Sequence, residues 1–273
     1  MASTKAIKTR IRSIENTRQI TRAMELVAAS GLKRALAELE QSLPYFTLLQ
    51  DALSGIASHN RDFTSPFTRP GKGEGSCYIV IAGDRGLAGG YNHNLFRSVR
   101  LKEEDFVYPI GKKTVEYFAG RCIDAPVLPT AQISYEDCNE AAQRLTDQFL
   151  KGSFSRLFLC YTTFINALLQ QPKTVPLLPV ISKEPIDTRT ATVYEPSAEQ
   201  VFADIVPQYI AGMIYGGVRS SYACELSARR RAMESASENA DEMLDKLRLS
   251  YNRARQAGIT QELAEITSGT QQR

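Results

Sequence analysis

The chain has 273 residues, of which 43% are hydrophobic and 23% are charged, a balance typical of an ordinary soluble protein. No apolar run approaches the roughly 18 to 20 residues that a membrane-spanning helix needs, so any membrane association is expected to be peripheral. The formal net charge of +3 is too small to indicate a nucleic-acid-binding protein.

The N-terminal segment is nevertheless basic. Residues 1–34 carry eight basic side chains against Glu15 and Glu25, a formal charge of +6, so the rest of the chain sums to about −3. A basic helix can face nucleic acid, anionic lipid or an acidic protein surface, and it is also often only a solvated face. The segment lacks the apolar core of a secretory signal, and we expect it to fold as part of the mature chain.

Residues 1–58 are predicted to form one long helix. Its apolar residues recur at alternating steps of four and three, the repeat of a coiled-coil seam. The blocks are Ile7, Ile11 and Ile14; Ile20, Met24 and Val27; Leu36, Leu39, Leu43 and Phe46; and Leu49, Leu53 and Ile56. The phase slips between these blocks, so we expect an irregular supercoil, with a kink or a break at Pro44.

Residues 59–75 are rich in Gly, Pro and Ser and are predicted to be a linker. Residues 76–197 alternate short β-branched runs with helical stretches, which favours a mostly parallel α/β sheet. The strand-like runs are CYIVIAG, DFVYPIG, RLFLCYT and VPLLPVI, and helices are expected around 94–99, 112–118 and 135–150. The last two strands could instead form a hairpin.

Residues 198–273 are predicted to form a second long helix. Its stripes are Phe202, Val206, Tyr209 and Met213; Ala240, Leu244, Leu247, Tyr251 and Ala254; and Ile259, Leu263 and Ile266. Neither long helix can bury its stripe alone, so we expect the two to pair antiparallel. Because the second helix is longer, its end is expected to lack a partner helix and to need another protein to cover it.

The chain offers no evident catalytic, cofactor-binding or metal site. The segment AGDRGLAGGYNHNLF follows the first strand, but it reproduces neither GxGxxG nor a P-loop, and a tight structural turn is the better interpretation. Neither His59 nor His93 lies next to an evident nucleophile or ligand set. The five cysteines form no CxxC pair, which fits scattered free thiols better than disulfides or zinc ligands.

Three segments resemble the gamma subunits of F-type ATP synthases of the bacterial type. They are IKTRIRSIENTRQITRAMELVAAS (7–30), DRGLAGGYNHNLF (84–96) and LSYNRARQAGITQELAEITSG (249–269), in the family's order. In the third segment, Ile259, Thr260, Glu262, Glu265 and Gly269 fall at the family's expected places. The departures are Ala88 where the family usually has cysteine, Gly31 where it has lysine, and the tail that begins at Thr270.

The resemblance implies a fold of the α/β plus all-α class. In it, a long antiparallel coiled coil of the two terminal helices carries a Rossmann-like α/β domain inserted between them. It implies a non-catalytic rotor shaft, one copy per complex, which couples proton translocation to ATP synthesis. The implied partners are the alpha and beta subunits, the epsilon subunit and the proteolipid c ring, without nucleic acid or a cofactor. The implied location is peripheral, at the cytoplasmic face of the bacterial plasma membrane.

By the same resemblance, a polar collar and an apolar bearing contact the beta subunits near the C-terminus. The collar residues are Arg255, Gln256, Thr260 and Glu262, and the bearing residues are Leu263 and Ile266. A basic face of Lys8, Arg12, Lys33 and Arg34 would suit acidic beta-subunit loops. Tyr209 and Tyr215 are candidates for the foot, at the membrane ring or the epsilon subunit.

Two other functions stay open at this stage. A nucleotide-binding oxidoreductase would retain its cofactor on purification and give a titratable binding isotherm. A free-standing coiled-coil scaffold would elute alone or as a homodimer, and not with ATPase subunits.

Overall fold

Residues 4–59, 64–180 and 194–270 are described by the computed structural model, which divides into two compact units. The helical unit consists of residues 1–29 and 229–273, and the sheet unit of residues 30–228. Two long helices contribute to both units: α1 (Thr4–His59) and α5 (Ala198–Thr270). Each unit is described below by itself.

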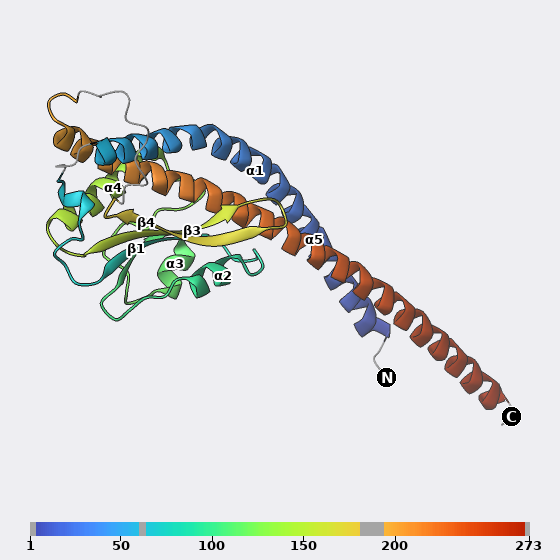
Figure 1. Ribbon diagram of the computed structural model, residues 1–273. Helices are drawn as coiled ribbons and strands as arrows, with labels where there is room; N and C mark the ends of the chain where they lie inside the picture. The colour runs from blue at the N-terminus through green and yellow to red at the C-terminus, as the bar shows by residue number, and fades with distance from the viewer. Residues whose placement is uncertain (1–3, 60–63, 181–193, 271–273) are drawn as a thin grey trace. The chain divides into compact units, whose positions relative to one another are not determined.

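The sheet unit is built on a four-stranded mixed sheet in the order β2-β1-β3-β4 (Figure 1). The strands are β1 (Ser76–Ile81), β2 (Phe106–Ile110), β3 (Arg156–Phe164) and β4 (Gln170–Leu178). Strand β1 pairs in parallel with β2 and with β3, while β3 pairs antiparallel with β4. The hairpin alternative for the last two strands is therefore the correct one, and β4 begins earlier than the run VPLLPVI suggested.

Helices cover both faces of this sheet. Alternate residues of a strand point to opposite faces, and in β1 the side chains of Cys77, Ile79 and Ile81 join one core while Val80 joins the other. The first core also contains apolar residues of α4 (Tyr135–Leu150) and α5. The second contains residues of α2 (Tyr91–Ser98), next to α3 (Lys112–Tyr117). Figure 1 shows α2 and α3 on the side of the sheet away from α5.

Helix α5 is more apolar than the sequence interpretation allowed. An 18-residue window within it reaches a mean hydropathy of 1.2, enough by length and composition alone for a membrane span, but 50% of that window is buried. Ile210, Ile214 and Val218 are fully buried in the first core of the sheet unit. The core helix of a soluble protein meets the same criterion, and the contact with the sheet explains the apolar run here. The prediction that no stretch of the chain is long and apolar enough for a membrane span is therefore wrong by length and composition.

In the helical unit, α1 and α5 pair antiparallel, as expected. Arg18 Nη1 contacts Asp241 Oδ1 at 2.5 Å, and Arg248 Nη2 lies 3.4 Å from Glu15 Oε1. Between these helices the hydroxyls of Thr21 and Ser237 share a buried hydrogen bond of 2.7 Å. Residue numbers rise along one helix as they fall along the other, which fixes the antiparallel direction.

The seam of α1 differs from its predicted phase. Ile20 and Val27 are 61% and 72% exposed, while Thr21 and Ala28 are buried. The buried or half-buried positions 7, 11, 14, 18, 21, 25 and 28 keep unbroken four-three steps, so the predicted phase slip after Ile14 is wrong. Polar and small residues occupy the seam here, and the periodicity of large apolar residues alone could not show them.

The stripes of α5 are partly as predicted. Phe202, Val206 and Tyr209 are buried in the sheet unit, and Ala240 and Leu244 are buried in the helical unit. Side chains further along are half-buried or exposed, and Ile266 lies outside the described side chains. Within the predicted linker, η1 (Pro66–Thr68) is a short 3-10 helix. It carries Phe67, which is buried.

Candidate functional site

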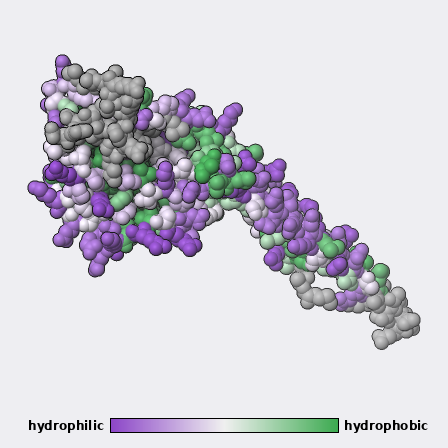
Figure 2. All heavy atoms as spheres, in the orientation of Figure 1, coloured by the Kyte–Doolittle hydropathy of each residue, from purple (hydrophilic) through white to green (hydrophobic). Residues whose placement is uncertain are grey.

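The helical unit exposes several large apolar side chains. On α1, Ile20, Leu26 and Val27 are 61%, 64% and 72% exposed. On α5, the exposed large apolar side chains of this unit are Met243, Leu249, Ile259 and Leu263. Figure 2 shows apolar side chains among polar ones on the visible face of this unit. Among the described residues of the helical unit, no third layer covers these side chains, so the surface is suited to a surrounding partner.

The last turns of α5 run past the start of α1. The pairs Thr21–Ser237, Arg18–Asp241 and Glu15–Arg248 set the register, and its extension puts Thr4, where α1 begins, opposite residues 254–259. Helix α5 continues to Thr270. Its final segment therefore lacks a paired stretch of α1 within the described residues.

The predicted collar and bearing residues lie at the start of this final segment and within it: Arg255 and Gln256 lie in the stretch opposite Thr4, and the others lie beyond it. Arg255, Gln256 and Thr260 are exposed, and the Thr260 hydroxyl donates to the Gln256 carbonyl at 3.0 Å. Within the described residues, the Gln256 side-chain amide and the Arg255 guanidinium make no hydrogen bond or ion pair with α1. Leu263 is 61% exposed. The side chains of Glu262 and Ile266 lie outside the described residues.

All four residues of the predicted basic face are exposed. Lys8 and Arg12 belong to the helical unit, and Lys33 and Arg34 belong to the sheet unit. Exposure of the positive groups is what an electrostatic contact with an acidic surface requires. It is also what a solvated face shows, so their role stays a prediction.

The two predicted foot tyrosines have different surroundings. Tyr209 is only 7% exposed and belongs to the first core of the sheet unit, where burial raises the pKa of its hydroxyl. Tyr215 is half-buried, and its ring lies under the guanidinium of Arg219, 4.7 Å from the ring centroid. Tyr135 meets it edge-on at 6.0 Å. Tyr215 therefore presents more surface to a partner than Tyr209 does.

The glycine-containing turn after β1 is held by its own side chains. Asp84 Oδ1 accepts from the Lys112 backbone N–H at 3.1 Å, and Oδ2 accepts from the backbone N–H and the hydroxyl of Thr130 at 2.9 and 3.0 Å. The Gly83 backbone N–H donates to Asn92 Oδ1 at 2.9 Å. These bonds connect the turn to the start of α3 and to the following loop. The turn therefore has a structural role.

A buried carboxylate lies beneath this turn. Glu225 of α5 is 3% exposed, and a Cβ added to Gly83 would lie 2.7 Å from its carboxyl carbon. Burial, and next the charge of Glu225, raise the pKa of the Tyr91 hydroxyl well above its ordinary value. The sequence interpretation missed Glu225, because an acidic residue on a long helix reads as part of a solvated face. Glycine immediately after a buried strand was the signal that another group approaches there.

The described part of the chain shows neither a cluster of metal ligands nor a thiol suited to nucleophilic chemistry. No group of three or more His, Cys, Asp or Glu side chains gathers there as a metal site. All five cysteines are free thiols, as predicted, and four of them are buried. Burial raises the pKa of Cys138 and Cys224 to about 12, which makes their thiols poor nucleophiles.

Comparison with known proteins agrees with this arrangement. A family model described as ATP synthase matches residues 3–271. The ATP synthase gamma chain of Ruminococcus albus is 42% identical, with 99% of this chain and 98% of that protein covered. The gamma chain of Alkaliphilus metalliredigens is 36% identical over 97% of this chain and 96% of that protein.

Solved structures share the fold at lower identity. The rotor of the Euglena gracilis mitochondrial ATP synthase includes a chain with a TM-score of 0.68 and 15% identity, covering 94% of this chain and 99% of that one. The central stalk and c ring of the Tetrahymena thermophila enzyme include one with a TM-score of 0.60 and 22% identity, covering 80% of this chain and 99% of that one. On the family model and the near full-length relatives, the chain belongs to the ATP synthase gamma-chain family.

Proposed function

We propose that this chain is the central-stalk rotor shaft of an F-type ATP synthase, which couples proton flow through a membrane ring to ATP synthesis or hydrolysis in an alpha/beta ring. The exposed apolar surface of the helical unit carries the proposal. Seven large apolar side chains of α1 and α5 are about half or more exposed in this unit: Ile20, Leu26, Val27, Met243, Leu249, Ile259 and Leu263. Such a surface is suited to a sleeve of partner protein.

The helical unit has the mechanical properties that a shaft needs. Two helices joined by Arg18–Asp241, Glu15–Arg248 and a buried hydroxyl pair resist bending and slippage better than a single helix does. The pair is asymmetric, because α5 continues beyond the start of α1. Each surrounding catalytic subunit would therefore meet a different face of it.

The collar and the bearing divide the contact by chemistry. Arg255 and Gln256 offer N–H donors to a beta-subunit loop, and Arg255 can make charge-assisted bonds worth about 1.5 to 3 kcal/mol each. Leu263 offers an apolar contact with little friction against an apolar sleeve. Thr260 contributes mainly to the helix, since its hydroxyl is bound to the Gln256 carbonyl. Glu262 and Ile266 are assigned to the same contacts by their sequence positions.

Other contacts follow the same proposal. Lys8, Arg12, Lys33 and Arg34 would steer acidic beta-subunit loops, where complementary charge adds more to register than to affinity. At the foot, Tyr215 is the stronger candidate for contact with the epsilon subunit or the proteolipid ring, because Tyr209 is buried. The chain has no catalytic role of its own in this proposal, and the alpha and beta subunits bind the nucleotide.

The proposal also assigns a role to each segment of the chain and a location to the complex. The functional segments are residues 1–58 and 198–273 for the shaft helices, 59–75 for the linker and 76–197 for the α/β domain. The complex would sit at the cytoplasmic face of a bacterial plasma membrane, with this chain as a peripheral subunit in one copy. Gamma-chain relatives from Ruminococcus and Alkaliphilus support a bacterial setting.

Reconstitution tests the proposal directly. Alpha and beta subunits are assembled with and without this chain, anchored to a surface, and supplied with ATP, while a bead attached to the sheet unit is followed by microscopy. Continuous rotation in one direction is expected only with the chain present. Elution of the chain alone or as a homodimer, without alpha and beta subunits, would favour a free-standing scaffold. A saturable nicotinamide-nucleotide isotherm for the isolated chain would favour the oxidoreductase.

A further inference from the structure

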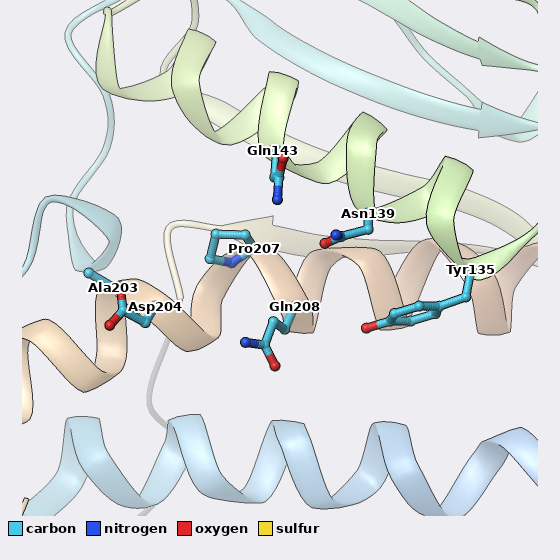
Figure 3. Close-up of a pocket in the computed structure, with 7 residues that line it drawn as sticks. All are labelled: Tyr135, Asn139, Gln143, Ala203, Asp204, Pro207 and Gln208. Atoms are coloured by element: carbon cyan, nitrogen blue, oxygen red, sulfur yellow. The ribbon is translucent and has the colours of Figure 1, made fainter.

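A polar groove lies between α4 and α5 in the sheet unit, outside the predicted site residues. Its volume is about 390 Å³, within the range of small-molecule sites. The lining residues are Tyr135, Asn139 and Gln143 of α4, and Ala203, Asp204, Pro207 and Gln208 of α5. Figure 3 shows Asn139 and Gln143 projecting from α4 toward α5, with Tyr135 at one end and Asp204 at the other.

Helical spacing explains why these side chains meet. Tyr135, Asn139 and Gln143 stand four residues apart on α4, so they lie above one another on one face. On α5, Asp204 and Gln208 are spaced in the same way. Two polar stripes therefore line opposite sides of one groove, next to the apolar core that the same helices form with the sheet.

The polar groups of the groove are available to a ligand. Within the described part of the chain, the side chains of Asn139, Gln143, Asp204 and Gln208 make no hydrogen bond or ion pair with another residue. Pro207 has no backbone N–H, so it cannot give the Ala203 carbonyl the hydrogen bond that a helix normally provides. The groove thus offers a carboxylate, three side-chain amide oxygens and a backbone carbonyl as acceptors.

The charge of the lining selects the ligand. Asp204 is the charged lining residue, and no Lys, Arg or His is among the seven. An anion would meet a carboxylate without a compensating positive group, whereas a cation would be paired. The ring of Tyr135 adds a face over which a flat cation can stack. A guanidinium group, planar and with five N–H donors, matches this mixture of acceptors and aromatic surface.

We propose that the groove between α4 and α5 binds a guanidinium or primary ammonium group. The group has two possible sources: a free small cation, or an Arg or Lys side chain of a protein docked against these two helices. The contact with Asp204 supplies the charge pairing, and the amide oxygens of Asn139, Gln143 and Gln208 orient the donors. Binding of the group to the isolated chain does not depend on the proposed rotor function.

Binding is tested on the isolated full-length chain with a matched pair of probes. N-acetylargininamide carries the guanidinium, and N-acetylcitrullinamide is its neutral counterpart of the same shape. Each is titrated into ¹⁵N-labelled chain, and the side-chain amide signals of Asn139, Gln143 and Gln208 are followed by NMR. The arginine compound should bind about tenfold more tightly or better, as charge-assisted hydrogen bonds imply. Equal binding of the two compounds would overturn the proposal.

Variants assign the binding to the groove. Asp204→Asn should weaken binding of N-acetylargininamide by about tenfold, while Gln208→Glu, which adds a second carboxylate, should tighten it. Glu140→Gln removes an exposed carboxylate of α4 that does not line the groove, and should leave binding unchanged. An affinity that falls equally in Asp204→Asn and Glu140→Gln would show only general charge attraction, and would contradict the assignment.

A second arm distinguishes the sources of the cation. Gln143→Cys places a thiol at the groove and keeps Asp204. Its reaction rate with a maleimide is compared between the isolated chain and the chain in a purified ATP synthase complex. A large decrease in the complex supports a partner side chain as the occupant, whereas an unchanged rate excludes a docked partner and leaves a free cation, whose binding the titration measures, as the source.

Discussion

Arg219 of α5 and Glu38 of α1 form an ion pair across the two long helices of the sheet unit, with 3.1 Å between Nη1 and Oε2. The arginine side chain is only 11% exposed, while the glutamate side chain is 41% exposed. The second guanidinium nitrogen donates to the Ile133 carbonyl at 2.9 Å, and the group lies over the Tyr215 ring. One arginine thus fastens α5 to α1 and to the residue before the N-cap of α4.

Replacing Arg219 should therefore destabilise the chain more than replacing Glu38 does. Arg219→Met removes the contacts with Glu38, Ile133 and Tyr215 together, and should lower the free energy of unfolding by about 2 to 3 kcal/mol. Glu38→Gln leaves the other two contacts in place and removes a partly exposed charge, so about 1 kcal/mol or less is expected. Urea unfolding followed by circular dichroism measures both. Equal losses would contradict the view that the arginine joins three elements.

The buried hydroxyl pair of the helical unit gives a second prediction. Thr21→Val alone should destabilise the chain by about 1 to 3 kcal/mol, because it leaves the Ser237 hydroxyl buried without its partner. Thr21→Val combined with Ser237→Ala should recover most of this loss, because two apolar groups then meet. A double-mutant cycle from urea unfolding gives the coupling energy. Additive effects of the two substitutions would show that the hydroxyls do not stabilise each other.

Gly83 and Gly86 provide a matched pair of glycines in one turn. A Cβ at Gly83 would lie 2.7 Å from the Glu225 carboxyl carbon, whereas a Cβ at Gly86 meets nothing within 4 Å. Gly83→Ala should therefore cost about 1 to 3 kcal/mol, the usual penalty for overpacking, and Gly86→Ala should cost little. The midpoints of thermal unfolding of the two variants measure this difference in stability. A Gly83→Ala protein as stable as Gly86→Ala would show that Glu225 moves away freely.

How much the sequence can predict depends on where the partner of a residue lies. The strands are visible as β-branched runs and α4 as a helical stretch around 135–150, because these signals are local. The structure adds that Ser134 and Asp137 form a capping box at the start of α4. The burial of Thr21 and Glu225 is not visible, since it is decided by residues about 140 to 216 positions away. Polar side chains on a long helix look solvated until its neighbour is placed.

The candidate site shows the same division. The exposure of Arg255, Gln256 and Leu263 agrees with their motif, whereas the groove around Asp204 could not be predicted. Its two stripes are separated by about sixty residues of chain, and each stripe alone resembles a solvated face. Likewise, Gly31 looks only like a weak point in a helix, but a Cβ there would lie 3.2 Å from Leu226 Cδ1, which shows how closely the helices approach.

The capping box gives a prediction about pH. Hydrogen bonds from the Ser134 backbone N–H and hydroxyl lower the pKa of Asp137 from its ordinary value of 3.8. A carboxyl whose pKa is lower in the folded state stabilises the fold above its unfolded pKa, and the contribution is lost as pH falls through the folded pKa. Asp137→Asn should therefore flatten the loss of stability below about pH 4. Glu136→Gln, at the neighbouring exposed position, is the control, and urea midpoints between pH 2.5 and 7 are the measurement. Equal slopes for Asp137→Asn and wild type would contradict the predicted linkage.

The sharpest prediction concerns Arg255 and Gln256. Both are exposed on α5 at the level where α1 begins, so they contribute little to the fold of the isolated chain. In the proposed collar, by contrast, Arg255 would pair with a beta-subunit carboxylate in charge-assisted bonds worth about 1.5 to 3 kcal/mol each. A helix-surface ion pair with a neighbouring residue would contribute at most about 0.5 kcal/mol.

Replacing both residues with alanine should therefore leave the helical content and the unfolding midpoint of the isolated chain unchanged, while ATP-driven proton pumping by the assembled complex falls. Fluorescence quenching of a pH-sensitive dye in membrane vesicles measures pumping, and subunit quantification confirms assembly. Arg253→Ala together with Asn252→Ala, exposed one turn earlier, is the matched control and should pump normally. Normal pumping by a fully assembled Arg255→Ala, Gln256→Ala complex would return these residues to a solvated face. Equal losses in the two double variants would mean that the helix end, and not the collar, sets the coupling.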